Sequence, residues 1–81
     1  MKTDEIDALI GANMKRLRKS AGITQSGLAD KLGLHQHQVW KYENARDRIS
    51  SSRLWLIAEA LKVNLLELFK GVSNTSMEKK Q

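Results

Sequence analysis

The sequence contains no cysteine and no proline, and only four of its 81 residues are aromatic. The absence of cysteine excludes a disulfide framework, a thiolate metal site and a cysteine nucleophile. No run approaches the roughly 18 apolar residues of a membrane span, and the acidic stretch Thr3-Asp4-Glu5 is unlike the start of a signal peptide. We therefore expect a soluble protein of the cytoplasm that has no membrane partner.

Positive charge is concentrated in the middle of the chain. The formal net charge is +5, but residues 1–14 carry one basic and three acidic residues, whereas residues 15–53 carry nine basic and three acidic ones. Such a basic segment favours one face that binds a polyanion such as nucleic acid. Charge alone leaves an ordinary surplus of surface lysine as the alternative.

Apolar residues recur at helical spacing along most of the chain, and no segment alternates with period two. With an apolar fraction of 41%, the chain has enough apolar residues for one aliphatic core. The clearest stripes are Ile6, Leu9, Ile10, Met14 and Leu17 near the start, and Leu54, Ile57, Ala58 and Leu61 further on. We expect an all-α fold, a compact bundle of five short helices, over residues 4–71, with residues 72–81 as a flexible polar tail.

Capping residues predict where the first two helices begin and end. Thr3 or Asp4 can start the first helix, which ends before Gly22. Thr24 caps the second helix, and Gly33 closes it, since glycine readily adopts the left-handed backbone of a sharp turn.

The remaining three helices have similar signals. The third runs from about residue 36 to 44, and Ser50 or Ser51 caps the fourth. Asn64 and Glu67 have the spacing of a capping box for a last short helix. Trp55 lies just outside the apolar stripe of the fourth helix, and we expect it to be part of the core.

The segment after Gly33 carries side chains that are unusual for a merely solvated helix face, where glutamate and lysine are better helix formers. The expected outward residues are Gln36, His37, Gln38, Trp40, Lys41 and Asn44. A carboxamide matches the N6 and N7 edge of adenine in the major groove with two hydrogen bonds. Two short helices joined by a tight turn, with amides on the second, therefore favour DNA binding.

The motif Thr24-Gln25-x-x-Leu28-Ala29-x-x-x-Gly33-Leu34, followed by Val39-x-Lys41-Tyr42-Glu43-Asn44, resembles the helix-turn-helix family of phage repressors, Cro proteins and Xre-type bacterial regulators. The resemblance extends over residues 6–71, through Ile10-Gly11, Leu17-Arg18 and Arg48-Ile49-Ser50-x-x-Arg53-Leu54-x-x-Ile57-Ala58-x-x-Leu61. It implies a lambda-repressor-like DNA-binding domain.

The resemblance also implies roles for individual residues. Gln25 matches a position that binds a phosphate and braces the first residue of the reading helix. Arg18 and Glu43 match a pair that forms a partly buried salt bridge. The positions that meet base edges are Gln36, His37 and Lys41, with Gln38 and Trp40 as further candidates. Candidates for the DNA backbone are Asn44, Arg46, Arg48 and Arg53, the three arginines being clustered beside the reading helix.

Some residues depart from the family pattern or leave alternatives open. Ala45 replaces a common glycine, so we expect the loop to leave the third helix by another route. Trp40 could cover the edge of the core or contact a thymine methyl group or a sugar. His35 and His37, two residues apart on a helix, point to different faces and have no third ligand near in sequence, so we expect no metal site and no cofactor. No catalytic motif is present, and we expect no enzyme activity.

The expected function is that of a sequence-specific regulator of transcription that binds double-stranded DNA. Specific operators usually need two reading helices, so we expect a homodimer on a near-palindromic operator, formed through Leu66, Phe69 and Leu56. Repression by blocking polymerase is the simplest mechanism, and activation through RNA polymerase is the alternative; the protein would be associated with the nucleoid. Two rival functions are an antitoxin-like module that binds a partner protein and a basic amphipathic binder of anionic membranes.

Overall fold

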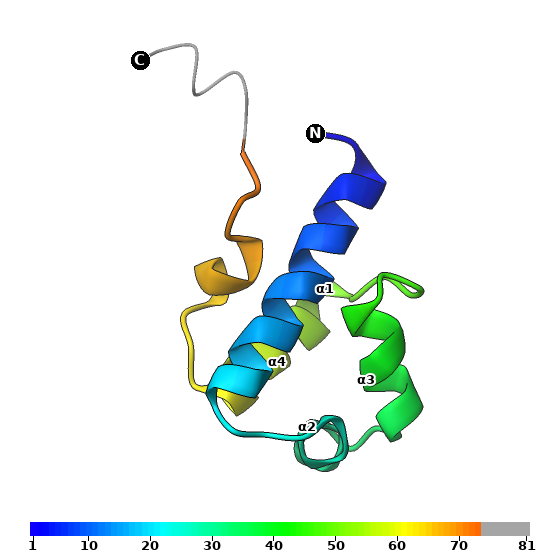
Figure 1. Ribbon diagram of the computed structural model, residues 1–81, viewed down its shortest axis with the longest axis vertical. Coiled ribbons are helices and arrows are strands. Elements are labelled where there is room, and N and C mark those ends of the chain that lie inside the picture. Colours follow the sequence, from blue (N-terminus) through cyan, green and yellow to red (C-terminus); the bar gives the residue numbers. More distant parts are fainter. Residues whose placement is uncertain (74–81) are drawn as a thin grey trace.

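The computed structural model describes residues 1–73, and this part of the chain is all helical (Figure 1). Its elements are α1 (Thr3–Ser20), α2 (Gln25–Leu32), α3 (Gln36–Glu43), α4 (Ser51–Leu61) and the 3-10 helix η1 (Leu65–Phe69). The all-α prediction is confirmed, although the fifth helix is a short 3-10 helix. The predicted tail lies outside the described residues from residue 74 onward. No helix within residues 1–73 is long and apolar enough to cross a membrane.

The helix-turn-helix boundaries follow from local side-chain and backbone chemistry. Thr24 Oγ1 accepts a hydrogen bond from the Gly27 backbone N–H at 2.9 Å, which caps α2 as expected. Gly33 ends α2 in the left-handed conformation at φ 68°, where a side chain would be strained. The two helices are therefore joined at the predicted glycine.

The other helix starts are capped partly as predicted. Ser50 Oγ caps α4 by accepting from the Arg53 N–H, and Asn64 Oδ1 caps η1 by accepting from the Leu66 N–H. The predicted start of α1 at a Thr3 or Asp4 cap is wrong. The cap position is Lys2, whose backbone N–H donates to the Glu5 carboxylate at 2.8 Å. In a capping box the carboxylate of the first turn accepts from the N–H of the cap residue itself, and this is the contact that Glu5 makes here.

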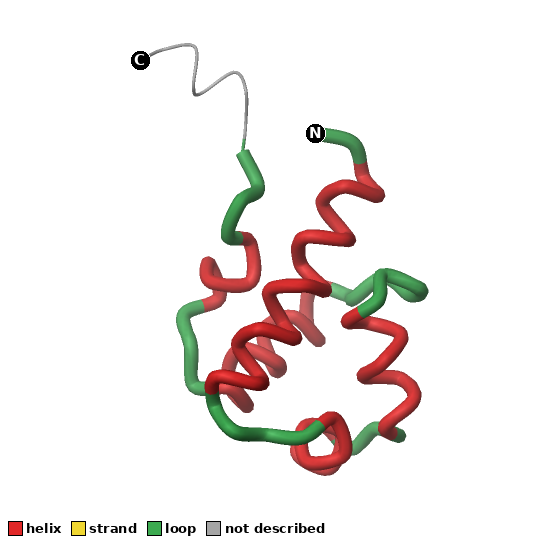
Figure 2. Tube along the Cα trace, viewed as in Figure 1, coloured by secondary structure: helices red, strands yellow, loops and turns green. Residues whose placement is uncertain are grey.

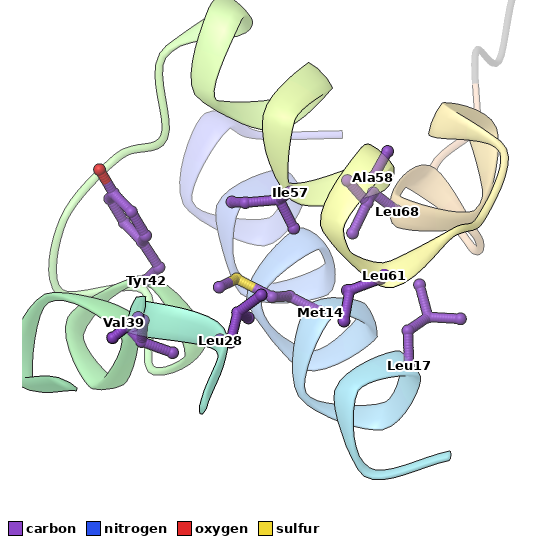
Figure 3. Packing of buried hydrophobic residues seen from close by; sticks show 10 residues of the cluster. Met14, Leu17, Leu28, Val39, Tyr42, Ile57, Ala58, Leu61 and Leu68 are labelled. Carbon is purple, nitrogen blue, oxygen red and sulfur yellow. The ribbon is translucent and has the colours of Figure 1, made fainter. Parts of the chain in front are cut away.

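Every element supplies a side chain to the core. The five largest fully buried side chains come one each from α1, α2, α3, α4 and η1, and they are Met14, Leu28, Val39, Ile57 and Leu68 (Figure 3). Figure 2 shows α1 crossing in front of α4, with α3 to the right, α2 below and η1 to the left. Burial of each such side chain contributes about 1.5–3 kcal/mol to the stability of the fold. Because Val39 of α3 packs in the same core as side chains from every other element, the position of α3 depends on the whole domain.

Two small residues of α1 fix the elements that pack against it. A Cβ on Gly11 would lie 2.6 Å from the Tyr42 carbonyl oxygen, so the backbones of α1 and α3 are in direct contact there. Asn13 is buried, and its Nδ2 donates to the carbonyl oxygens of Leu68 at 2.9 Å and Lys70 at 2.8 Å. The first contact holds the end of α3, and the second holds the end of η1.

The expectation that Trp55 belongs to the core is wrong. The inward face of α4 is made by Ile57, Ala58 and Leu61, and Trp55 is 57% exposed. Two residues along a helix correspond to a rotation of about 200°, so Trp55 faces away from Ile57.

Candidate nucleic-acid interface

Helix α3 has one buried and one exposed side. Val39 and Tyr42 are buried in the core, together with Glu43 at the end of the helix. Gln36 and His37, in its first turn, are exposed. The helix is thus fixed along one side while its first turn is presented to solvent.

A hydrogen-bonded ion pair locks the C-terminal end of α3 to α1. Arg18 Nε donates to Glu43 Oε2 at 2.6 Å and Arg18 Nη2 donates to Glu43 Oε1 at 3.1 Å. Arg18 Nη1 donates to the Ile23 carbonyl oxygen at 2.8 Å, so all three guanidinium nitrogens are used. The Glu43 side chain is fully buried and that of Arg18 is 8% exposed. The structure thus brings together the two residues that the resemblance pairs.

Gln25 joins this network to the exposed face. Its Nε2 donates to Glu43 Oε1 at 3.1 Å, which ties the first residue of α2 to the last of α3. Gln25 also lines an open hollow together with Gln36, His37 and Trp40. The candidate phosphate-binding residue and three candidate base readers therefore share one surface.

Trp40 lies on the surface of α3, where neighbouring side chains pack against its ring. Its ring stacks on that of His37, with centroids 5.5 Å apart and 9° between the planes. The Arg46 guanidinium carbon lies 5.9 Å from the centroid of the Trp40 ring. Trp40 is 39% exposed, so these neighbours hold a flat side chain on the outer surface of α3.

Gln38 and Lys41 are less accessible than the first turn of α3. Both are half-buried, and Gln38 Nε2 donates to Asp47 Oδ2 in the following loop at 2.9 Å. A base contact by Gln38 would have to replace this bond. Both base contacts stay predictions, and they are less favoured by geometry than that of Gln36.

The loop after α3 keeps the left-handed turn that the replaced glycine would favour. Ala45 has φ 54°, so the expected different route out of the helix is wrong. Asn44 is exposed, and its Nδ2 donates to the Trp40 carbonyl oxygen at 2.9 Å, which closes the helix end. The alanine adopts this turn at a cost of about 1–2 kcal/mol because the surrounding contacts require it.

The three candidate arginines differ in their surroundings. Arg46 is exposed beside Trp40. Arg48 is also exposed, and its Nε lies 3.1 Å from Asp7 Oδ2 on α1. Arg53 is half-buried, and its Nη1 is buried without a hydrogen-bond partner among the described residues. Arg46 is therefore the most available for a phosphate, and Arg48 would first have to leave Asp7.

The candidate dimer residues lie on α4 and η1. Leu56 and Leu66 are exposed, whereas Phe69 is half-buried and packs against the core. The structure shows a single chain, so their role stays a prediction. Residues 1–73 contain no group of three or more side chains suited to hold a metal ion.

Sequence reasoning assigned no structural role to three residues that contact α3 or the loop after it. Asp7 pairs with Arg48, Asp47 accepts from Gln38, and Gly11 lets α3 approach α1. Among these three residues, only Gly11 has a feature in the sequence that could have indicated its role. Glycine in a helix interior costs about 1 kcal/mol relative to alanine, which is typical of a close backbone approach.

The chain matches the helix-turn-helix family model over residues 14–68, more than half of its length. It therefore belongs to the helix-turn-helix family. The resemblance inferred from the sequence motifs is confirmed.

Two similar proteins are named as transcriptional regulators. The chain is 39% identical over 72 residues to an uncharacterized HTH-type transcriptional regulator of Rickettsia conorii, a match that covers 89% of this chain and 58% of that protein. It is 41% identical over 67 residues to an uncharacterized transcriptional regulator in the ATPase CF(0) region of Rhodospirillum rubrum, covering 83% and 62% of the two. The chain thus spans less than two thirds of these relatives.

Solved structures share the fold. The restriction-modification controller protein C.AhdI of Aeromonas hydrophila superposes with a TM-score of 0.73 at 29% identity, covering 76% of this chain and 94% of that one. A hypothetical transcription factor from Neisseria, NHTF, gives a TM-score of 0.76 at 26% identity, covering 100% and 92%.

Proposed function

We propose that this domain reads a specific sequence in double-stranded DNA by placing the exposed face of α3 in the major groove. The observation that carries the proposal is that the C-terminal end of α3 is anchored to α1 and α2 while its first turn is exposed. Glu43 is held by Arg18 and Gln25, while Gln36 and His37 stay exposed. A side chain reads a base edge only if its helix is fixed, since hydrogen bonds depend on distance and angle.

Contacts with the DNA backbone would come from the flanks of this face. Gln25 lies at the start of α2, and Asn44, Arg46 and Arg48 follow the end of α3. Phosphate contacts set the register of a protein on the duplex, whereas base contacts set its sequence preference. The proposed division is therefore base readout by α3 and phosphate binding on both sides of it.

The domain would act as a homodimer on a near-palindromic operator. One reading helix of eight residues contacts few base pairs, and two such helices about 34–36 Å apart read two half-sites. Exposed Leu56 and Leu66 support an interface on α4 and η1. A dimer bound over a promoter in the cytoplasm would repress transcription by excluding polymerase.

Selection of bound sites from random duplex DNA at a stated salt concentration tests the proposal. We expect two related half-sites in inverted orientation. Gln36→Ala should cost about 1–3 kcal/mol and relax the preference at one position of each half-site. Arg48→Ala should weaken all sequences alike and reduce the salt slope by about one unit. Lys70→Ala, which removes the same charge outside this surface, is the matched control.

The outcomes separate the parts of the proposal. Absence of any sequence preference would contradict base readout by α3. An equal effect of Gln36→Ala and Arg48→Ala on sequence discrimination would contradict the division of roles. Sedimentation that shows a monomer both free and on DNA would contradict the homodimer, for which Leu66→Asp should weaken operator binding while the half-site preference remains.

A further inference from the structure

Helix α3 carries a stacked aromatic surface that the proposed amide readout does not use. His37 and Trp40 lie one helical turn apart and stack with nearly parallel rings, and Arg46 lies against Trp40 from the following loop. Stacking and the adjacent cation each stabilise one orientation of the indole. This places a fixed, largely carbon surface beside Gln36, which lines the same hollow.

A flat carbon surface has few partners in the major groove. The base edges there present hydrogen-bond donors and acceptors, apart from the C5-methyl group of thymine. A 5-methylcytosine places the same methyl group at the same position of a C·G pair. An indole has one N–H donor and no acceptor, so most of its edge can gain energy only by covering an apolar group.

We propose that the His37–Trp40 surface is a specificity-determining site for the C5-methyl group of a pyrimidine, thymine or 5-methylcytosine, in the bound half-site. This inference rests on the proposed function, because it requires α3 to enter the major groove. Gln36 would read adenine through hydrogen bonds, while Trp40 excludes water from a pyrimidine methyl group nearby. Arg46 and His37 act as positioning residues that hold the indole in place.

The experiment measures binding of the full chain to its selected operator after removal of single methyl groups. Each thymine of a half-site is replaced in turn by deoxyuridine, which lacks the methyl group and keeps the same hydrogen-bonding edge. At one position per half-site we expect binding to weaken about four-fold, the effect of exposing one buried methyl group. A second arm places cytosine or 5-methylcytosine opposite guanine at that position, and the methylated duplex should bind more tightly by a similar factor.

Variants assign the effect to the aromatic surface. Trp40→Ala should bind the thymine and deoxyuridine duplexes equally, and Trp40→Phe should keep part of the difference. His37→Ala should reduce the difference, since the indole loses its stacking partner. Trp55→Ala removes an exposed tryptophan of α4 and should leave the ratio unchanged.

The wild-type measurement alone can overturn the inference. If no deoxyuridine substitution changes binding to a sequence-specific operator, Trp40 contacts a sugar or no part of the DNA. A difference that persists in Trp40→Ala would assign methyl recognition to another residue. A sensitivity to thymine without one to 5-methylcytosine would limit the site to T·A pairs. If the chain shows no sequence preference at all, the proposed function itself fails, which is a separate result.

Discussion

Two ion pairs connect α1 with α3 and its following loop, and they differ in almost every physical respect. Arg18 and Glu43 are buried, with two hydrogen bonds between them and a third to Gln25. Arg48 and Asp7 share one contact of 3.1 Å, and the arginine side chain is 69% exposed. A buried charge that loses its partner is very costly, whereas an exposed pair contributes about 0–1 kcal/mol.

The difference separates the two requirements of a DNA-reading domain. The position of α3 must not change, and the buried pair gives it a fixed end near the backbone contact of Gly11. The phosphate-binding loop must instead exchange one partner for another. An exposed arginine with a single weak contact can do this at little cost, because water and salt already compete for it.

The largest expected effect comes from breaking the buried pair. Glu43→Ala leaves the Arg18 guanidinium buried without a counter-ion and should cost about 3–5 kcal/mol of unfolding free energy. Urea unfolding followed by circular dichroism measures this loss. The double variant Arg18→Met, Glu43→Met should recover most of it, since neither charge remains. A cost below about 1 kcal/mol for the single change would place this pair in the same class as the exposed one.

A smaller loss is expected from Gly11→Ala, which disturbs the same anchor without changing a charge. The added Cβ would lie 2.6 Å from the Tyr42 carbonyl oxygen and 2.7 Å from that of Glu43. Backbone atoms cannot rotate away, so α3 must shift from α1, at about 1–3 kcal/mol. Thermal unfolding and operator affinity should both fall.

Gly27→Ala is the matched control for this variant. Its added Cβ would meet Thr24 Oγ1 at 3.2 Å and Ile23 Cγ2 at 3.3 Å, both side-chain atoms, so a small shift that slightly lengthens the Thr24 cap bond makes room for it. The gain in helix propensity offsets that contact, so the change in stability should be smaller than for Gly11→Ala. Equal losses in the two variants would contradict the assignment of Gly11 to a backbone anchor.

The limits of sequence reasoning follow the same division between local and distant contacts. Thr24, Gly33 and Ser50 were predicted as helix boundaries because each acts on a backbone group within a few residues of itself. Asp7 was not connected with Arg48, 41 residues away, and Asn13 was not connected with the Leu68 carbonyl, 55 residues away. Only the packing of α1 against the rest of the chain brings these groups together.

Trp55 shows a second limit, which concerns helix faces. The apolar stripe of α4 predicts one buried face, but hydrophobicity alone wrongly added the tryptophan beside it. The buried arc of a helix is set by the neighbours that cover it, and the contacts of α4 are with α1, α2 and η1. The outward face expected for α3 was more accurate, since Gln36, His37, Trp40 and Asn44 are exposed, although Gln38 and Lys41 are half-buried.

The smallest effect on stability is expected at the exposed pair, where the change should appear in DNA binding. Asp7→Asn removes the carboxylate that competes with phosphate for Arg48, so operator affinity should rise roughly two- to five-fold at low salt, the factor for an interaction of at most about 1 kcal/mol. Asp4→Asn is the matched control, because it removes the same charge from α1 without a salt bridge to a basic side chain in the described part of the chain. Fluorescence anisotropy at several salt concentrations measures the affinity of both variants, and the advantage of Asp7→Asn should disappear in an Arg48→Ala background.

If the two asparagine variants gain equally, Asp7 acts only through long-range repulsion of the duplex, and the exposed pair does not exchange its carboxylate for a phosphate.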